Sequence, residues 1–175
     1  MLTDNGAAVV KRSPLTVREI VSLGLLGAIM FVGQVAIAAI PNVEIVTLLV
    51  IVCAMVYGLK SLFAVFVFVL LEGLLYGINT WWISYLYVWP VLALIVLPFR
   101  KMNGYVLFSI IAAIHGLCFG ALCTIPYFFI GGPTLAFTYW VAGIPWDVIH
   151  GVSNFIIVFS LLKPTRSLLT RLAGT

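Results

Sequence analysis

Three polar side chains interrupt an apolar stretch near the end of the chain, and their types suit them to chemistry. Asp147, His150 and Asn154 all lie in the segment that begins at Tyr139. On an α-helix, their spacing puts all three on one face. A carboxylate beside an imidazole can move protons, hold a ligand or brace two helices. Because polar groups are costly inside a bilayer, we expect this face to look onto a cavity, a neighbouring helix or a ligand.

Two interpretations of Asp147 and His150 stay open from the residues alone. They form a mutually satisfied pair that fixes helix packing, or they contact a ligand or serve a conformational change. We expect His115 to be a hydrogen-bonded structural histidine. A metal site built from these three residues is not favoured, because the chain has no metal-binding spacing such as HExxH. The chain also lacks a nucleophile motif and a phosphate-binding glycine loop, so we expect no catalysis and no ATP hydrolysis by this chain.

Composition predicts an integral membrane protein. Of the 175 residues, 64% are hydrophobic and only 8% are charged, and the mean hydropathy is +1.25. These values lie far outside the range of soluble domains. The net charge of +4 is scattered over segment ends, which disfavours nucleic-acid binding. The three cysteines lie inside apolar runs, so we expect free thiols, and we expect no cleaved signal peptide.

Apolar runs separated by polar or helix-breaking residues predict the elements that position these side chains. Each run is long enough to cross ~30 Å of hydrocarbon as a helix. The runs cover residues 20–40, 43–59, 62–78, 81–99, 105–130 and 135–162. We therefore predict an all-α integral membrane protein, a bundle of six transmembrane helices within one domain over residues 1–175. Its parts are a cytoplasmic arm (1–18), the bundle (19–163) and a cytoplasmic tail (164–175).

The basic residues predict the orientation of this bundle, because lysine and arginine gather in cytoplasmic loops. If both termini are cytoplasmic, every basic residue falls on the cytoplasmic side. These residues are Lys11, Arg12, Arg18, Lys60, Arg100, Lys101, Lys163, Arg166 and Arg171. The outer loops then carry no lysine or arginine.

Aromatic residues crowd the predicted outer ends of the last three helices and are sparser at the inner ends. An interfacial belt would occupy both sides, so the asymmetry predicts an outward-facing aromatic pocket for a flat or bulky organic ligand. The expected site residues are Asn42, Glu44, Glu72, Tyr76, Asn79, Trp82, Tyr85, Trp89, Tyr139, Trp140, Trp146, Asp147 and His150. The absence of basic residues from the outer half favours neutral or cationic ligands.

Four segments, together with the size and the helix pattern, resemble the substrate-binding S components of energy-coupling factor (ECF) vitamin transporters. The segments are Pro41 to Glu44, Leu70 to Gly73, Trp82 to Tyr87 and Gly143 to Asn154. The resemblance implies a vitamin site near the outer surface of a bacterial cell membrane. It also implies an ABC-type importer in which a transmembrane coupling protein and two cytoplasmic ATPases are the partners, so that the S component itself is not an enzyme.

In that family, small residues four positions apart on the first helix contact the coupling protein. The nearest match here is Gly24 and Ala28, with glycine in place of the first alanine. The same spacing also favours ordinary close packing inside the bundle. Both uses of the two residues stay open.

The vitamin is the least determined part of this interpretation. Folate, biotin and pantothenate each carry a carboxylate, and the outer half offers no cation to pair with it. Cobalamin, which is bulky and neutral to cationic, is the first candidate, whereas pyridoxine or a pyrimidine precursor of thiamine would suit a smaller pocket around Asp147. An alternative from another class is a proton-coupled secondary transporter or intramembrane enzyme that uses Asp147 and His150 as a proton relay.

Overall fold

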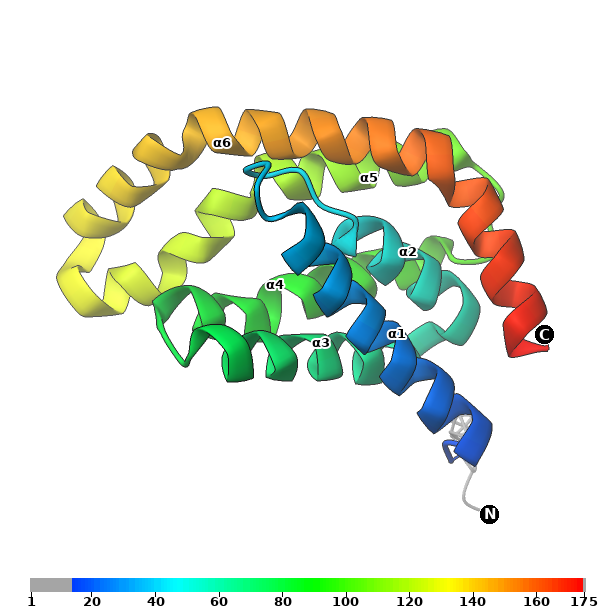
Figure 1. Cartoon of the computed structure of the whole chain (residues 1–175). Helices are drawn as coiled ribbons and strands as arrows, with labels where there is room; N and C mark the ends of the chain where they lie inside the picture. Colours follow the sequence, from blue (N-terminus) through cyan, green and yellow to red (C-terminus); the bar gives the residue numbers. More distant parts are fainter. Residues whose placement is uncertain (1–13, 175) are drawn as a thin grey trace, which may run out of the picture.

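The computed structural model describes residues 14–174, and within them it contains helices and turns but no strand (Figure 1). The elements are α1 (Val17–Ile37), α2 (Val46–Tyr57), the short 3-10 helix η1 (Gly58–Lys60), α3 (Ser61–Tyr76), α4 (Thr80–Val96), the 3-10 helix η2 (Leu97–Phe99), α5 (Tyr105–Leu117) and α6 (Phe119–Ala173). The prediction of an all-α fold is confirmed for this part of the chain. Most of the predicted N-terminal arm, residues 1–13, lies outside the described residues.

Four helical stretches are long and apolar enough to cross a membrane. They are Val17–Ile37, Val46–Tyr76, Thr80–Phe99 and Tyr105–Ala173. Two of these stretches contain a point at which the chain turns back. α2 and α3 reverse direction at Gly58, whose φ is 60°, and α6 breaks at Gly131 and Gly132 (Figure 1).

The break inside α6 divides it into two arms that run in nearly opposite directions in Figure 1. Gly132 has φ 73° and ψ −171°, a backbone conformation that only glycine adopts without strain. Pro133 follows and starts the second arm, where its fixed φ suits a first helical turn. The sequence pattern therefore located this turn correctly at the boundary between the runs 105–130 and 135–162.

Several element boundaries differ from the prediction, including the following three. The second helix begins at Val46 rather than 43, because residues 38–45 form a loop of turns. The run 105–130 is interrupted at Cys118, where α5 ends and α6 begins. The last helix continues to Ala173 instead of ending near 163, since backbone hydrogen bonding does not require apolar side chains. Hydrophobic runs report the membrane-sized part of a helix and miss its polar extension.

α2 lies at the centre of the molecule, and the other helices pack around it. Val50, Ile51 and Val52 are consecutive and all fully buried, so this helix is covered on every side. α1 packs against α3 through Gly27, where an added Cβ would meet the Ala64 carbonyl oxygen. Close approach of these two helices therefore depends on Gly27.

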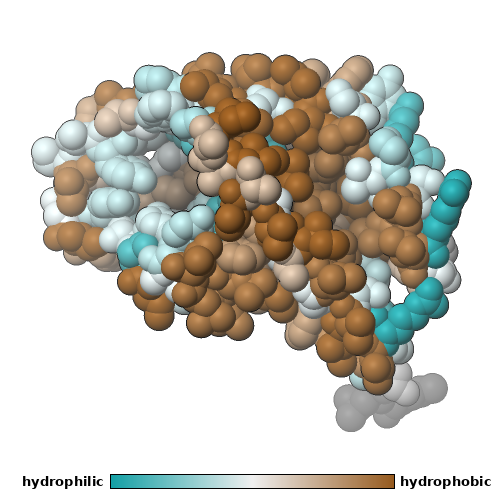
Figure 2. Space-filling model, in the orientation of Figure 1, coloured by the Kyte–Doolittle hydropathy of each residue, from teal (hydrophilic) through white to brown (hydrophobic). Residues whose placement is uncertain are grey.

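Basic side chains join four separate elements at one end of the molecule. Lys60 Nζ lies 2.7 Å from Glu19 Oε1 and ties the α2–α3 turn to the start of α1. Arg18 Nη2 donates to the Leu172 carbonyl oxygen at 2.7 Å, which places the start of α1 beside the end of α6. Arg166 donates to the turn before α5. Figure 2 shows hydrophilic side chains at this end and a largely hydrophobic surface over the middle of the molecule.

Candidate functional site

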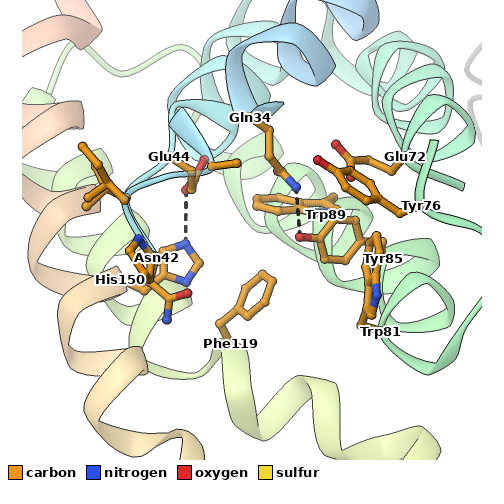
Figure 3. A pocket seen from close by; sticks show the side chains of 14 residues that line it. Gln34, Asn42, Glu44, Glu72, Tyr76, Trp81, Tyr85, Trp89, Phe119 and His150 are labelled. Atoms are coloured by element: carbon orange, nitrogen blue, oxygen red, sulfur yellow. Dashed lines mark hydrogen bonds and ion pairs between the residues drawn. The ribbon is translucent and has the colours of Figure 1, made fainter. Parts of the chain in front are cut away.

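A pocket of about 280 Å³ opens at the end of the molecule opposite the basic side chains. Figure 3 shows the side chains that line it. It lies between the end of α1, the 38–45 loop, the end of α3 and the start of α4. Its walls are formed by Gln34, Ala38, Ile40, Pro41, Asn42, Val43, Glu44, Glu72, Tyr76, Trp81, Tyr85, Trp89, Phe119 and His150. Aromatic rings and carboxylates dominate this lining, and none of the lining residues is lysine or arginine.

The loop over this pocket is held by side chains at both of its flanks. Asn42 has φ 57°, in the left-handed region that asparagine tolerates better than most residues. Its carbonyl oxygen accepts a hydrogen bond from Ser153 Oγ at 3.0 Å, which attaches the loop to α6. Glu44 Oε2 accepts from the Thr47 backbone N–H at 2.8 Å and so caps the start of α2.

Glu44 also forms an ion pair with α6. Its Oε1 lies 3.2 Å from His150 Nε2, and both residues are more than nine-tenths buried. Burial raises the pKa of Glu44, but the hydrogen bond and charge of His150 and the hydrogen bonds from Thr47 outweigh this effect and hold the pKa below its ordinary value. The Glu44 carboxylate is therefore charged, and each of its two oxygens has a hydrogen-bond partner.

Glu72 is in the opposite situation. Its side chain is fully buried on α3, it lines the same pocket, and neither carboxylate oxygen has a hydrogen-bond partner among residues 14–174. Buried polar groups are normally paired, because desolvation without a compensating hydrogen bond is costly. An unpartnered buried carboxylate in a cavity points to a ligand that supplies the missing partner.

A row of aromatic rings faces this carboxylate from α4. Trp81, Tyr85 and Trp89 follow one another at intervals of four residues, which places them on one face of the helix. Ring centroids lie 5.0 Å apart between Trp81 and Tyr85 and 5.5 Å apart between Tyr85 and Trp89, both in edge-to-face geometry. Gln34 Nε2 donates to the Tyr85 hydroxyl at 3.3 Å and fixes that ring (Figure 3).

A second cavity of about 340 Å³ adjoins the first and shares Asn42 and Phe119 with it. Its other lining residues are Gly120, Cys123, Tyr139, Ala142, Gly143, Trp146 and Asp147. Asp147 Oδ1 accepts from the Gly120 backbone N–H at 2.9 Å, at the positive end of α6. Asp147 Oδ2 is buried without a partner in the described part of the chain.

The polar face of α6 contacts three different partners. Asp147 bonds to Gly120, and His150 pairs with Glu44. Asn154 Nδ2 donates to Thr47 Oγ1 at 3.1 Å. Within residues 14–174, no hydrogen bond joins Asp147 to His150, so the two residues brace different neighbours instead of forming one pair.

His115 lies on α5 and lines neither cavity. Its Nε2 is 3.2 Å from the Val88 carbonyl oxygen, and its ring packs 5.9 Å from that of Trp89. This arrangement fits the structural role expected for it. Between residues 14 and 174, no three histidine, cysteine or acidic side chains are grouped so that they could hold a metal ion.

Most of the expected site residues line one of the two cavities. Those in the first cavity are Asn42, Glu44, Glu72, Tyr76, Tyr85, Trp89 and His150. Those in the second are Asn42, Tyr139, Trp146 and Asp147.

The remaining three expected residues line neither of these cavities. Asn79 caps α4 by accepting from the Trp82 backbone N–H at 3.1 Å. The Trp82 ring packs on Gly73, and its Nε1 donates to the Val69 carbonyl oxygen at 2.8 Å. Trp140 packs beside Phe137. Asn79 and Trp82 therefore stabilise the α3–α4 corner.

The lining residues that the expected set lacked include Gln34, Trp81, Phe119 and Gly120. Two of them carried a signal in the sequence. Gln34 is a lone amide inside an apolar run, and Trp81 is four residues before Tyr85. Phe119 and Gly120 directly follow Cys118, where α5 ends and α6 begins, and no sequence signal predicted this helix boundary.

Comparisons with protein-family models, curated proteins and solved structures found no match for this chain. The geometry of the two cavities therefore provides the evidence for a function.

Proposed function

We propose that this chain is a multi-pass protein of the bacterial cell membrane that captures a water-soluble vitamin for an ECF-type importer. The observation that carries the proposal is the first cavity, an aromatic pocket with an unpartnered carboxylate inside an otherwise apolar chain. A polar cavity in such a protein suits a water-soluble ligand, and intramembrane ionisable residues are usually functional. The resemblance of four segments to S components supports the same function.

The proposed topology has six transmembrane helices with both termini in the cytoplasm. The reversals at Gly58 and Gly132 support it, because each divides a long apolar stretch into two helices. The gathering of basic side chains at one end supports the orientation, since such residues favour the cytoplasmic side. The pocket would then open toward the outside.

The proposed partners are a transmembrane coupling protein and two cytoplasmic ATPases, which would supply the energy. The surface of α1 is compatible with such a partner. Gly24 has no atom within 4 Å of the place where a Cβ would stand, and Ala28 is only partly buried. Small residues on an open helix face let a second helix approach closely.

The size of the pocket bears on the identity of the vitamin. A cavity of about 280 Å³ is at the lower end of small-molecule sites. It favours pyridoxine or a pyrimidine precursor of thiamine over cobalamin, because a corrinoid is several times larger and would require the 38–45 loop to move away.

Binding by the purified protein tests the capture step. We expect pyridoxine or the thiamine pyrimidine to bind saturably, with affinity in the nanomolar to low-micromolar range, and Trp81→Ala to weaken binding at least about tenfold because it removes a pocket wall. Trp140→Ala is the matched control, since Trp140 lies outside both cavities. Tight binding of cobalamin alone would reverse the order of candidates, and no binding of any vitamin would refute the capture role.

One observation favours a second candidate function. The buried pair of Glu44 and His150, 3.2 Å apart, joins two groups that exchange protons readily. A proton-coupled transporter would use this pair instead of ATPases. Uptake that collapses with a protonophore in cells without ECF ATPases would support this alternative.

A further inference from the structure

The chemical character of the ligand follows from the charges and rings around Glu72. We propose that the pocket recognises an organic cation, whose positive nitrogen lies between the Glu72 carboxylate and the aromatic row of Trp81, Tyr85 and Trp89. This inference deepens the proposed function and rests on the first cavity being the ligand site. It requires the bound ligand to be positively charged, as pyridoxine and the thiamine pyrimidine are when a ring nitrogen is protonated.

The two carboxylates of the pocket differ in their hydrogen-bond partners. Glu44 has two partners, because Oε1 faces His150 and Oε2 accepts from Thr47. Glu72 is fully buried, and no partner for either of its oxygens occurs in residues 14–174. No lysine or arginine lines the cavity, and the one imidazole there is already paired. With Glu72 ionised, the residues that line the pocket carry an excess of negative charge that a cation would balance.

The aromatic rings of the pocket favour a cation independently of Glu72. Electron-rich ring faces attract cations, most strongly those of tryptophan. Tyr76 and Trp81 have centroids 5.9 Å apart, and the row continues through Tyr85 to Trp89. All four rings line the same cavity as Glu72. Rings grouped around a carboxylate form a site for a quaternary or protonated nitrogen, whereas an anionic ligand would be repelled by both features.

A protonated Glu72 that donates to a neutral ligand is the competing interpretation. Glu72→Gln separates the two, because glutamine keeps the size and a hydrogen-bond donor but cannot carry the negative charge. Binding of a cation would suffer from this change, and binding of a neutral ligand would not. Glu19→Gln is the matched control, since it removes a carboxylate that lies outside the pocket and pairs with Lys60.

The experiment measures binding of two pairs of probes to the protein in lipid nanodiscs by tryptophan fluorescence. Each pair contains a cation and its neutral isostere: choline with 3,3-dimethyl-1-butanol, and thiamine with 3-deazathiamine. We expect the cation of at least one pair to bind about tenfold or more tightly than its isostere. Glu72→Gln should abolish that preference, and Glu19→Gln should preserve it.

Several outcomes would overturn the inference. They are equal binding of cation and isostere in both pairs, no saturable binding of either cation, or a preference that survives in Glu72→Gln. If Glu72→Gln does not fold, Trp81→Leu replaces it, and an unchanged preference in that variant counts against the inference equally. ATPase-dependent uptake of a vitamin that cannot carry a positive charge would refute the cation inference and leave the importer intact. Cation binding without ATPase-dependent uptake would refute the importer proposal and leave the cation inference intact.

Discussion

The three buried carboxylates of residues 14–174 have three different environments, and these environments separate their roles. Glu44 is paired with His150, and Asp147 caps the start of α6 through the Gly120 amide. Glu72 has neither an ion pair nor a hydrogen bond within residues 14–174. Glu44 and Asp147 therefore brace the helices around the cavities, and Glu72 is left for a ligand.

The Glu44–His150 pair predicts a pH dependence of stability. Burial raises the pKa of Glu44, yet its hydrogen bonds and the charge of His150 lower it below the ordinary value. A depressed pKa stabilises the fold above the ordinary carboxyl pKa, and the contribution is lost as the pH falls through the lowered value. We expect Glu44→Gln to cost about 1–3 kcal/mol at neutral pH. Thermal unfolding in detergent should show this difference shrinking below about pH 4; a constant difference would contradict the assignment.

Close approach of Asp147 to Gly120 predicts a steric effect. A Cβ at Gly120 would collide with the Asp147 carboxylate, so Gly120→Ala should destabilise the protein by about 1–3 kcal/mol. Gly24→Ala is the control, because the space around that position is open and alanine favours helix. Urea or thermal unfolding of the two variants provides the comparison. Equal stabilities would show that the contact is not needed.

At the scale of elements, the bend inside α6 creates the second cavity. Tyr139, Trp146 and Asp147 lie on the second arm and face Gly120 and Cys123 on the first. Stacking of Tyr127 on Tyr139, with ring centroids 4.0 Å apart, joins the two arms. The bend therefore positions the residues that line the second cavity.

The positive φ of Gly132 predicts that the bend in α6 requires glycine at this position. Gly132→Ala places a side chain at φ 73° and should cost about 1 kcal/mol or more. Gly143→Ala is the matched control within the same helix, because both positions have open space around the Cβ and differ in backbone conformation. Thermal melts of both variants test this, and a Gly132→Ala protein as stable as Gly143→Ala would refute the argument.

The sequence predicted the elements better than it predicted their partners. Periodicity placed Asp147, His150 and Asn154 on one face of a helix, and all three are buried. The partners of His150 and Asn154, which are Glu44 and Thr47, lie about a hundred residues away in the chain, and helical spacing does not encode such contacts. Local signals were informative where the structure is local, as at the turn between the runs 105–130 and 135–162.

The site shows the same limit. The excess of aromatic residues lies at the end of the helices where the structure has its cavities, but it did not separate rings that line a cavity from rings that pack the corner. Trp81 and Trp82 are adjacent, yet Trp81 lines the pocket and Trp82 packs on Gly73. A helix turns by about 100° per residue, so the role of each depends on the rotation of α4 against α3. That rotation is set by tertiary packing.

At the scale of the whole molecule, the two ends differ in chemistry. The basic side chains, the start of α1 and the end of α6 lie at one end. The aromatic cavities lie at the other end. Such a polarity suits a protein with a cytoplasmic end and an outer, ligand-receiving end.

Cysteine labelling tests this orientation. The three native cysteines are free, and Cys118 is exposed, so it is first replaced by serine. Ile78→Cys, at the pocket end, should react with a membrane-impermeant maleimide in intact cells. Lys101→Cys, at the basic end, should react only after the membrane is opened. The opposite pattern would invert the protein, and reaction of both positions from outside would refute the six-helix topology.

Uptake of a vitamin by cells with and without ECF ATPases tests the central claim most directly. Cells that express this chain with a coupling protein and active ATPases should accumulate labelled pyridoxine or thiamine pyrimidine. An ATPase variant that cannot hydrolyse ATP, or the Trp81→Ala variant of this chain, should remove the accumulation. Undiminished uptake without functional ATPases would contradict the account and favour proton coupling through Glu44 and His150.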